Sequence, residues 1–272
     1  MIIIELIYNL SLLVAFSVLS GFIDIRFKRT ELLGKIFQGL LFGITAIIGM
    51  MYPFVLAEGL IFDGRSIVVG LCTLFFGPIS GGIASLLAVL FRVSIGGTGI
   101  IMGILVILSS YAIGYIFHKN KIEKPEGKIS TVRLYIFGLI VHIALLIFVV
   151  TLPSGIIAEV YQTIGITVIG VYPVITVIIG KILLDQENQN ALIAELKKSE
   201  NKFRAITETS PSAIFIYQGT KFVYVNSGAV TLTGYSEEEL LERDFWSVVH
   251  PDHQELVRTR GMQRQNKESV EK

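Results

Sequence analysis

The chain has 272 residues, of which 52% are hydrophobic and only 17% are charged. This composition is too apolar for an ordinary soluble domain and is typical of an integral membrane protein. The formal net charge of +1 does not favour nucleic-acid binding, and the single cysteine, Cys72, excludes an internal disulfide and a cysteine-based zinc site. We therefore expect the lipid bilayer as a partner, no nucleic-acid partner, and no metal or cofactor.

Long apolar runs divide the first two thirds of the chain into candidate membrane spans. A helix needs roughly 20 apolar residues to cross the hydrocarbon core. The first run lacks the basic start and the cleavage site of a signal peptide, so we expect it to be retained. The clear candidates are 3–23, 34–54, 99–118, 133–152 and 156–181.

The segment 65–94 has two possible structures. It can form one long helix, or two short helices, 66–77 and 78–94, that meet at Gly77-Pro78. Proline has no backbone N–H and fits best at the start of a helix, so a second helix can begin at Pro78. One helix gives six spans in total, and two helices give seven.

The distribution of basic residues favours seven spans. Lysine and arginine gather in the loops 24–35 and 118–133 and in the tail after Lys181. Basic loops as a rule stay on the cytoplasmic side. Seven spans place all three segments on that side, with the N-terminus outside, whereas six spans do not. We predict a multi-pass protein of the plasma membrane with about seven spans, two of them short.

Seven spans place two arginines at the same, outer side of the membrane. Arg65 begins one short helix and Arg92 lies near the end of the other. An arginine inside the membrane costs roughly 2.5–3.5 kcal/mol and normally faces a partner or a wet cavity. The two arginines can bind a carboxylate together. Alternatively, each side chain can extend to the membrane interface so that its charge reaches water. Asp63 can pair with Arg65 or cap the helix that follows.

Other polar residues in the apolar part are weaker candidates. His142 lies in the middle of a span, as a packed, hydrogen-bonded residue or as a ligand contact. The sequence contains no pattern of a metalloprotease, a nucleophile elbow or a phosphate-binding loop, so no catalytic residue is predicted in this chain. Residues toward the outer side that can line the same cavity are Glu58, Glu159, Tyr161 and Gln162.

After Lys181 the composition changes from apolar to charged. The segment 182–203 contains apolar residues at heptad spacing over about two heptads. It is either a solvated linker helix or a signalling helix that forms a dimer. We favour the second interpretation and predict a homodimer through this helix.

The last part of the chain is predicted to be a small α/β module. Two β-rich runs, Ala213–Tyr217 and Lys221–Asn226, flank a turn and form a hairpin pattern. Ser236 and Glu239 have the spacing of a capping box at the start of a short helix.

Three motifs resemble the transmembrane sensor region of the LytS–YhcK type, a family named for five spans. They are Asp63-Gly64-Arg65, the FFGPISGG turn and the segment from Arg92 to Gly97. The resemblance covers roughly residues 30–182. It implies a compact helix bundle with an outward-facing cavity, similar to the membrane subunits of vitamin-uptake transporters.

The resemblance also implies a role for the two arginines. The pyruvate-sensing member of the family uses the arginines of these motifs in ligand binding, so Arg65 and Arg92 inherit that role as an expectation. The predicted ligand-binding residues are Arg65, Arg92, Asp63, Ser94, Gly96 and Gly97.

Residues 199–260 resemble the start of a PAS domain. The last three strands of a PAS sheet are not in the sequence, so we expect an incomplete module, followed in the full-length protein by a histidine kinase or a diguanylate cyclase. The matching segments are Glu200–Arg204, Tyr224–Asn226, Thr233–Leu240 and Val249–Asp252.

Together these features predict a mainly α protein with a transmembrane sensor domain (1–181), a signalling helix (182–203) and an incomplete cytoplasmic PAS domain (204–272). The predicted function is that of a signal-transduction receptor for a small extracellular ligand, with a carboxylate such as pyruvate as the candidate. The alternative is the substrate-binding subunit of a vitamin-uptake-type transporter.

Overall fold

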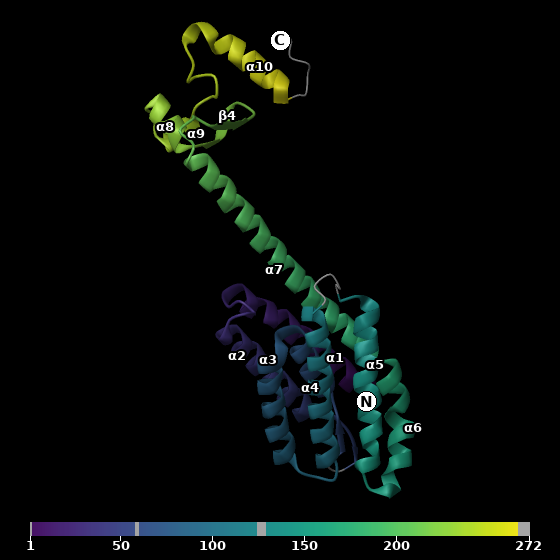
Figure 1. Cartoon of the computed structure of the whole chain (residues 1–272). Helices are drawn as coiled ribbons and strands as arrows, with labels where there is room; N and C mark the ends of the chain where they lie inside the picture. The colour runs from purple at the N-terminus through teal and green to yellow at the C-terminus, as the bar shows by residue number, and fades with distance from the viewer. Residues whose placement is uncertain (1, 58–59, 124–128, 266–272) are drawn as a thin grey trace. The chain divides into compact units, whose positions relative to one another are not determined.

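The computed structural model describes residues 2–57, 60–123 and 129–265, and it is mainly helical (Figure 1). It divides into two compact units, one that ends at Ala191 and one that begins at Leu192.

The first unit is a helix bundle. A short antiparallel hairpin of β1 (Phe54–Ala57) and β2 (Leu60–Phe62) connects the second and third helices. The helices are α1 (Ile2–Arg26), α2 (Leu32–Met51), α3 (Arg65–Ile95), α4 (Ile100–Glu123), α5 (Thr131–Phe148), the 3-10 turn η1 (Val149–Thr151), α6 (Ser154–Gly170) and the first part of α7 (Tyr172–Glu208).

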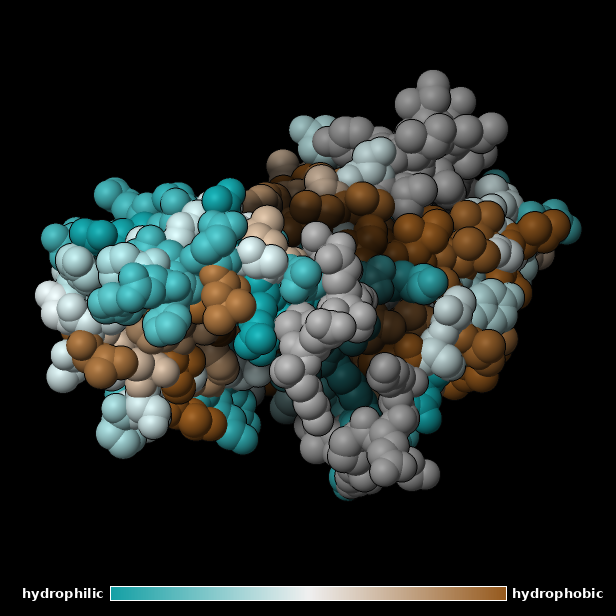
Figure 2. Space-filling model, turned by 90° about the horizontal axis from the view of Figure 1, so that it is seen from above, coloured by the Kyte–Doolittle hydropathy of each residue, from teal (hydrophilic) through white to brown (hydrophobic). Residues whose placement is uncertain are grey.

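Large apolar side chains cover much of the outside of this bundle. Leu86, Leu90 and Ile101 are at least 60% exposed, and Ile166 is 86% exposed. Brown hydrophobic patches on the surface in Figure 2 show such side chains. Within the described residues, five helical stretches are long and apolar enough to cross a membrane, which supports a multi-pass membrane protein. The count of seven spans stays a prediction.

Helix α3 consists of two halves that meet at Gly77. This residue has φ 84° and ψ −176°, a left-handed conformation that favours glycine. A Cβ atom on Gly81 would overlap the side chain of Thr73, although residues eight apart in one straight helix would be separated by about 12 Å. The chain therefore reverses direction at Gly77, where the sequence predicts a turn.

Helix α4 confirms the reversal, because it packs against both halves of α3. Gly114 approaches the carbonyl oxygen of Gly70 so closely that a Cβ atom would lie 2.7 Å from it. At the other end of α4, a Cβ atom on Gly103 would lie 2.6 Å from Nε of Arg92. Small residues permit this close approach of membrane helices.

The predicted last span, 156–181, is divided in the structure. Helix α6 ends at Gly170 and α7 begins at Tyr172, with Pro173 in its first turn. Proline donates no backbone hydrogen bond, so the helical bond from Pro173 to Ile169 is missing here. The bonds from Val171 to Thr167 and from Ile175 to Val171 continue the helical pattern across this junction. Helix α7 then extends through the predicted signalling segment to Glu208 without a break.

The second unit contains the predicted hairpin and capping box. The hairpin turns at Gly219, which has φ 60°, and Ser236 and Glu239 make both hydrogen bonds of the capping box. The elements are β3 (Phe215–Gln218), β4 (Lys221–Val225), α8 (Ser227–Thr233), α9 (Glu237–Glu242), the 3-10 turn η2 (Pro251–His253) and α10 (Gln254–Gln265). Its small core consists of Phe222, Val225, Ala229, Leu240 and Phe245.

The reversal in α3 can be tested by adding one methyl group. Gly81→Ala should destabilise the protein by about 1–3 kcal/mol, because the new Cβ atom overpacks the contact with Thr73. Gly82→Ala is the matched control, since a Cβ atom there meets nothing within 4 Å. Thermal unfolding of the detergent-solubilised chain measures both effects. Equal unfolding temperatures for the two variants would contradict the reversal.

The span count can be tested with single cysteines in a Cys72→Ala background. Seven spans place the exposed residue Glu31 inside and the exposed residue Thr98 outside, whereas six spans with the same C-terminus place both outside. A membrane-impermeant thiol reagent applied to intact cells should therefore label Thr98→Cys and leave Glu31→Cys unlabelled until the membrane is permeabilised. Labelling of both positions in intact cells would favour six spans.

Candidate ligand site at the buried arginines

Asp63 and Arg65 form a buried pair at the start of α3. The Asp63 carboxylate accepts a hydrogen bond from the backbone N–H of Arg65 at 2.7 Å and one from its Nη1 at 3.1 Å. Both residues are buried, with 5% and 7% of their surface exposed. Asp63 thus pairs with Arg65, which is one of the two predicted alternatives. It is not the N-cap residue of α3, which is Gly64, but it binds the N–H of Arg65 from the preceding position.

Arg92 lies at the end of the second half of α3 and is 1% exposed. Its Nη1 donates a hydrogen bond of 2.7 Å to the carbonyl oxygen of Gly96, which terminates the helix. The backbone of α4 passes beside its guanidinium group at Gly103, where a larger residue would not fit. The side chain is therefore enclosed between the end of α3 and the start of α4.

The reversal at Gly77 brings these charges together. The guanidinium groups of Arg65 and Arg92 are close enough to repel each other, and both attract the carboxylate of Asp63. Charges buried in this way have lost most of their hydration, and this loss is not always repaid by their mutual attraction. Such a group of charges in a membrane bundle is by default a candidate binding site.

Further polar side chains lie between α3, α5 and α7, next to the charge cluster of Asp63, Arg65 and Arg92. His142 on α5 is fully buried, and its Nδ1 donates to the carbonyl oxygen of Gly138 at 2.6 Å. A carbonyl oxygen can only accept, so Nε2 of the neutral ring is free to accept from the Ser66 hydroxyl at 3.3 Å. The ring of Tyr172, the first residue of α7, lies edge-on to His142 with centroids 5.1 Å apart.

Ser66 and Tyr172 are absent from the residues predicted from the sequence. Ser66 is a polar residue inside an apolar run and directly follows Arg65, which is a signal that sequence reasoning could have used. Tyr172 had no such signal, because only the packing of α7 against α5 brings its ring to His142. The structure places His142 as a packed, hydrogen-bonded residue, one of the two interpretations that the sequence left open.

Among the other predicted residues, Gly96 accepts the hydrogen bond of Arg92 through its carbonyl oxygen. Ser94 is exposed and donates to the carbonyl oxygen of Phe91, and Gly97 is exposed in the turn after α3. Tyr161, Glu159 and Gln162 are exposed on α6, and Glu58 lies outside the described residues.

Comparison with known proteins supports the arrangement that the motifs predict. The family model described as 5TMR of 5TMR-LYT matches residues 19–186, which is more than half of the chain. A PAS domain model matches residues 201–267. No curated protein and no solved structure matches the chain. The buried charge cluster lies within the first matched region.

The importance of the buried pair can be measured with Asp63→Asn. The amide still accepts the N–H of Arg65 but removes the negative charge, so the buried guanidinium groups lose their counter-ion. We expect destabilisation by about 3–5 kcal/mol, the usual range for breaking a buried pair on one side. Glu159→Gln, which removes an exposed carboxylate from α6, should have no comparable effect. Similar unfolding temperatures for both variants would show that Asp63 does not stabilise the cluster.

Proposed function

Because the chain belongs to the 5TMR-LYT family and carries a PAS domain, we propose that it is a LytS-type membrane sensor for a small extracellular carboxylate. In this proposal the ligand binds at Asp63, Arg65 and Arg92, and α7 transmits the signal to the PAS domain. The basic loops favour an orientation with the buried arginines toward the outside and the PAS domain in the cytoplasm.

The observation that supports the ligand site most strongly is the convergence of two buried arginines. They belong to different halves of α3, and the reversal at Gly77 brings their charges within electrostatic reach of each other. A guanidinium group presents a planar fork of N–H donors that matches a carboxylate. Two such forks beside one aspartate suit a small anion better than they suit any structural purpose, because an apolar pair would pack at lower cost.

Ligand binding must change the cluster in order to signal. A carboxylate that binds Arg65 competes with Asp63, which holds both the side chain and the backbone N–H of that residue. Tyr172 at the start of α7 is within reach of the charges of Asp63 and Arg65. A ligand that binds one arrangement of this cluster better than another would therefore shift the equilibrium of α7.

The other end of α7 is bonded to the PAS domain. Asn226 donates from Nδ2 to the carbonyl oxygen of Thr207 at 2.7 Å, and the Tyr224 hydroxyl donates to Glu208 at 2.7 Å. The backbone N–H of Ser227 donates to the same carboxylate at 2.9 Å. A displacement of this end of α7 would therefore strain or break its hydrogen bonds to β4 and α8.

The proposed dimer uses the exposed apolar face of α7. Leu192, Leu196 and Ile206 are each more than 60% exposed, so this face has no cover within the described part of the chain. A second copy of the helix is the partner that the heptad spacing favours.

The proposed output is a histidine kinase, as in a two-component system, or a diguanylate cyclase. A transporter subunit does not account for a helix that leads into a PAS domain.

The proposed ligand site is tested with arginine variants and a panel of small carboxylates, pyruvate first. A carboxylate that binds should raise the unfolding temperature of the purified chain, whereas its neutral amide should not. Arg65→Ala and Arg92→Ala should abolish this stabilisation. Arg65→Lys and Arg92→Lys keep the charge but lose the fork, and should weaken binding by about tenfold or more.

Arg133→Ala is the control, because it removes an arginine from the start of α5 and should leave the stabilisation intact. If a carboxylate stabilises both alanine variants as well as the unmodified chain, the assignment of Arg65 and Arg92 is wrong.

A further inference from the structure

A pocket lies at the turn between the two halves of α3, at the end of these halves that is opposite to Arg65 and Arg92. It has a volume of about 350 Å³ and is formed around the turn at Gly77. Its walls come from the loop after α1, from α2, from the turn of α3, and from α4 and α7, all within the first unit. None of the sequence motifs assigns a role to it.

Basic side chains predominate in this pocket. Arg29, Lys35 and Lys121 line it together with His118, whereas Glu187 is the one carboxylate among the lining residues. Two of the cations are held over aromatic rings, with Arg29 4.6 Å from the ring centre of Phe76 and Lys121 5.1 Å from that of Phe75. The pocket therefore has an excess of positive charge and suits an anion.

The rest of the lining is apolar. Besides the two phenylalanines, Pro78 and Ile79 form its rim, and Ile79 is 43% exposed. A small hydrophilic anion would gain nothing from contact with these apolar side chains, whereas the glycerol and acyl chains of a lipid would pack against them. Basic pockets between membrane helices at the cytoplasmic side are a known type of site for anionic headgroups.

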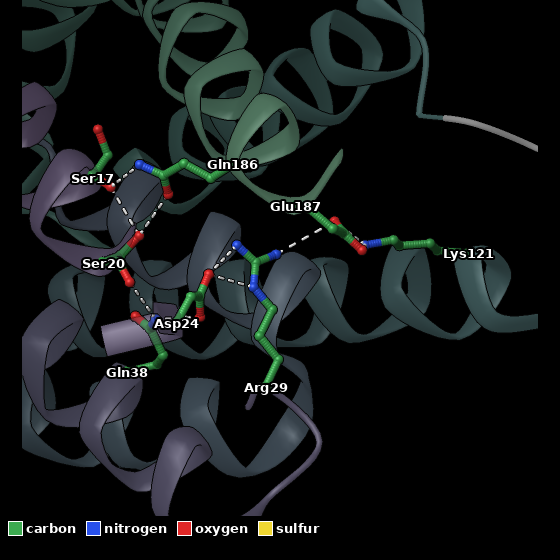
Figure 3. Close-up of polar contacts among 8 residues, drawn as sticks. All are labelled: Ser17, Ser20, Asp24, Arg29, Gln38, Lys121, Gln186 and Glu187. Atoms are coloured by element: carbon green, nitrogen blue, oxygen red, sulfur yellow. Dashed lines mark hydrogen bonds and ion pairs between the residues drawn. The ribbon is translucent and has the colours of Figure 1, made fainter. Parts of the chain in front are cut away.

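Within the protein, the carboxylate of Glu187 is already an ion-pair partner of two of these cations, Arg29 and Lys121. Its carboxylate accepts two hydrogen bonds from Nζ of Lys121, at 2.6 and 2.7 Å, and lies 3.4 Å from Nη1 of Arg29 (Figure 3). Arg29 also binds Asp24 of α1 through Nε at 2.7 Å. Lys121 thus has Glu187 as its ion-pair partner, while Arg29 is shared between two carboxylates.

These contacts tether α7 where it leaves the bundle. Next to Glu187, Gln186 donates to the carbonyl oxygen of Ser17 at 3.0 Å and accepts from Ser20 at 3.1 Å (Figure 3). Two successive residues of α7 are therefore bound to different neighbours, Gln186 to α1, and Glu187 to α4 and to Arg29 in the loop after α1. Loss of the Glu187 contacts would leave α7 held here mainly through α1.

We propose that this pocket binds the phosphate headgroup of an anionic phospholipid, and that the phosphate competes with Glu187 for Arg29 and Lys121. A phosphate has more acceptor oxygens than a carboxylate and can engage Lys35 as well. Binding would release Glu187 and loosen α7 from α4. The membrane composition would then modulate the signalling helix, independently of the carboxylate site at the other end of the hairpin.

The test uses the purified full chain in a neutral detergent with a short-chain phosphatidylglycerol, and phosphatidylcholine for comparison. Native mass spectrometry or a fluorescent lipid analogue gives the affinity. The unmodified chain should prefer phosphatidylglycerol. Lys121→Gln should weaken its binding by about fivefold, as expected for the loss of one basic side chain. Lys119→Gln removes the same charge from an exposed position of α4 outside the pocket and should change little.

Glu187→Gln distinguishes competition from a purely structural effect. It removes the internal anion, so it should tighten phosphatidylglycerol binding, whereas a variant that merely loosened the bundle would weaken it. Equal losses in Lys119→Gln and Lys121→Gln, or weaker binding in Glu187→Gln, would overturn the proposal. If inorganic phosphate displaces the lipid at equal concentration, the pocket binds soluble phosphate and the lipid assignment is wrong.

Discussion

The backbone conformation of Gly77 is the constraint on which the rest of the bundle depends. With φ at 84°, the chain reverses between the two halves of α3 instead of continuing as one helix. The reversal brings Arg65 and Arg92 to the same end, although 27 positions separate them in the sequence. The same turn forms the wall of the basic pocket at the other end. One residue in a left-handed conformation therefore makes both candidate sites possible.

The buried charges need an explanation, because removing charged groups from water costs free energy. A buried ion pair is often less stabilising than two apolar residues of the same size, while the loss of one member of the pair is strongly destabilising. Arg92 is the largest side chain among those almost completely buried in the described part of the chain. An ionisable side chain buried inside a membrane bundle is by default a candidate for a functional role. The proposed recognition of an anion would account for two arginines, an aspartate and a row of polar groups at one place.

The features that were predictable from the sequence depend on neighbouring residues or on composition. Proline chemistry and the distribution of lysine and arginine indicated the turn at Gly77, and a three-residue spacing indicated the capping box at Ser236. The contacts that the sequence did not reveal join distant residues. Ser66 and His142 are 76 positions apart, and Lys121 and Glu187 are 66 positions apart. Only the packed bundle determines such pairs, because many polar residues are available as partners for each of them.

Helix α7 relates the two candidate sites to each other. It begins with Tyr172 at the buried charge cluster, carries Glu187 in the basic pocket, and ends with Glu208 on the PAS domain. If a carboxylate at the arginines shifts this helix, and if a phosphate in the pocket releases it, the two ligands act on one equilibrium. Thermodynamic linkage then requires that each ligand changes the affinity for the other by the same factor. The size of that factor depends on how differently α7 contacts each site in its two arrangements, so a stiff, continuous helix between Tyr172 and Glu187 favours strong coupling.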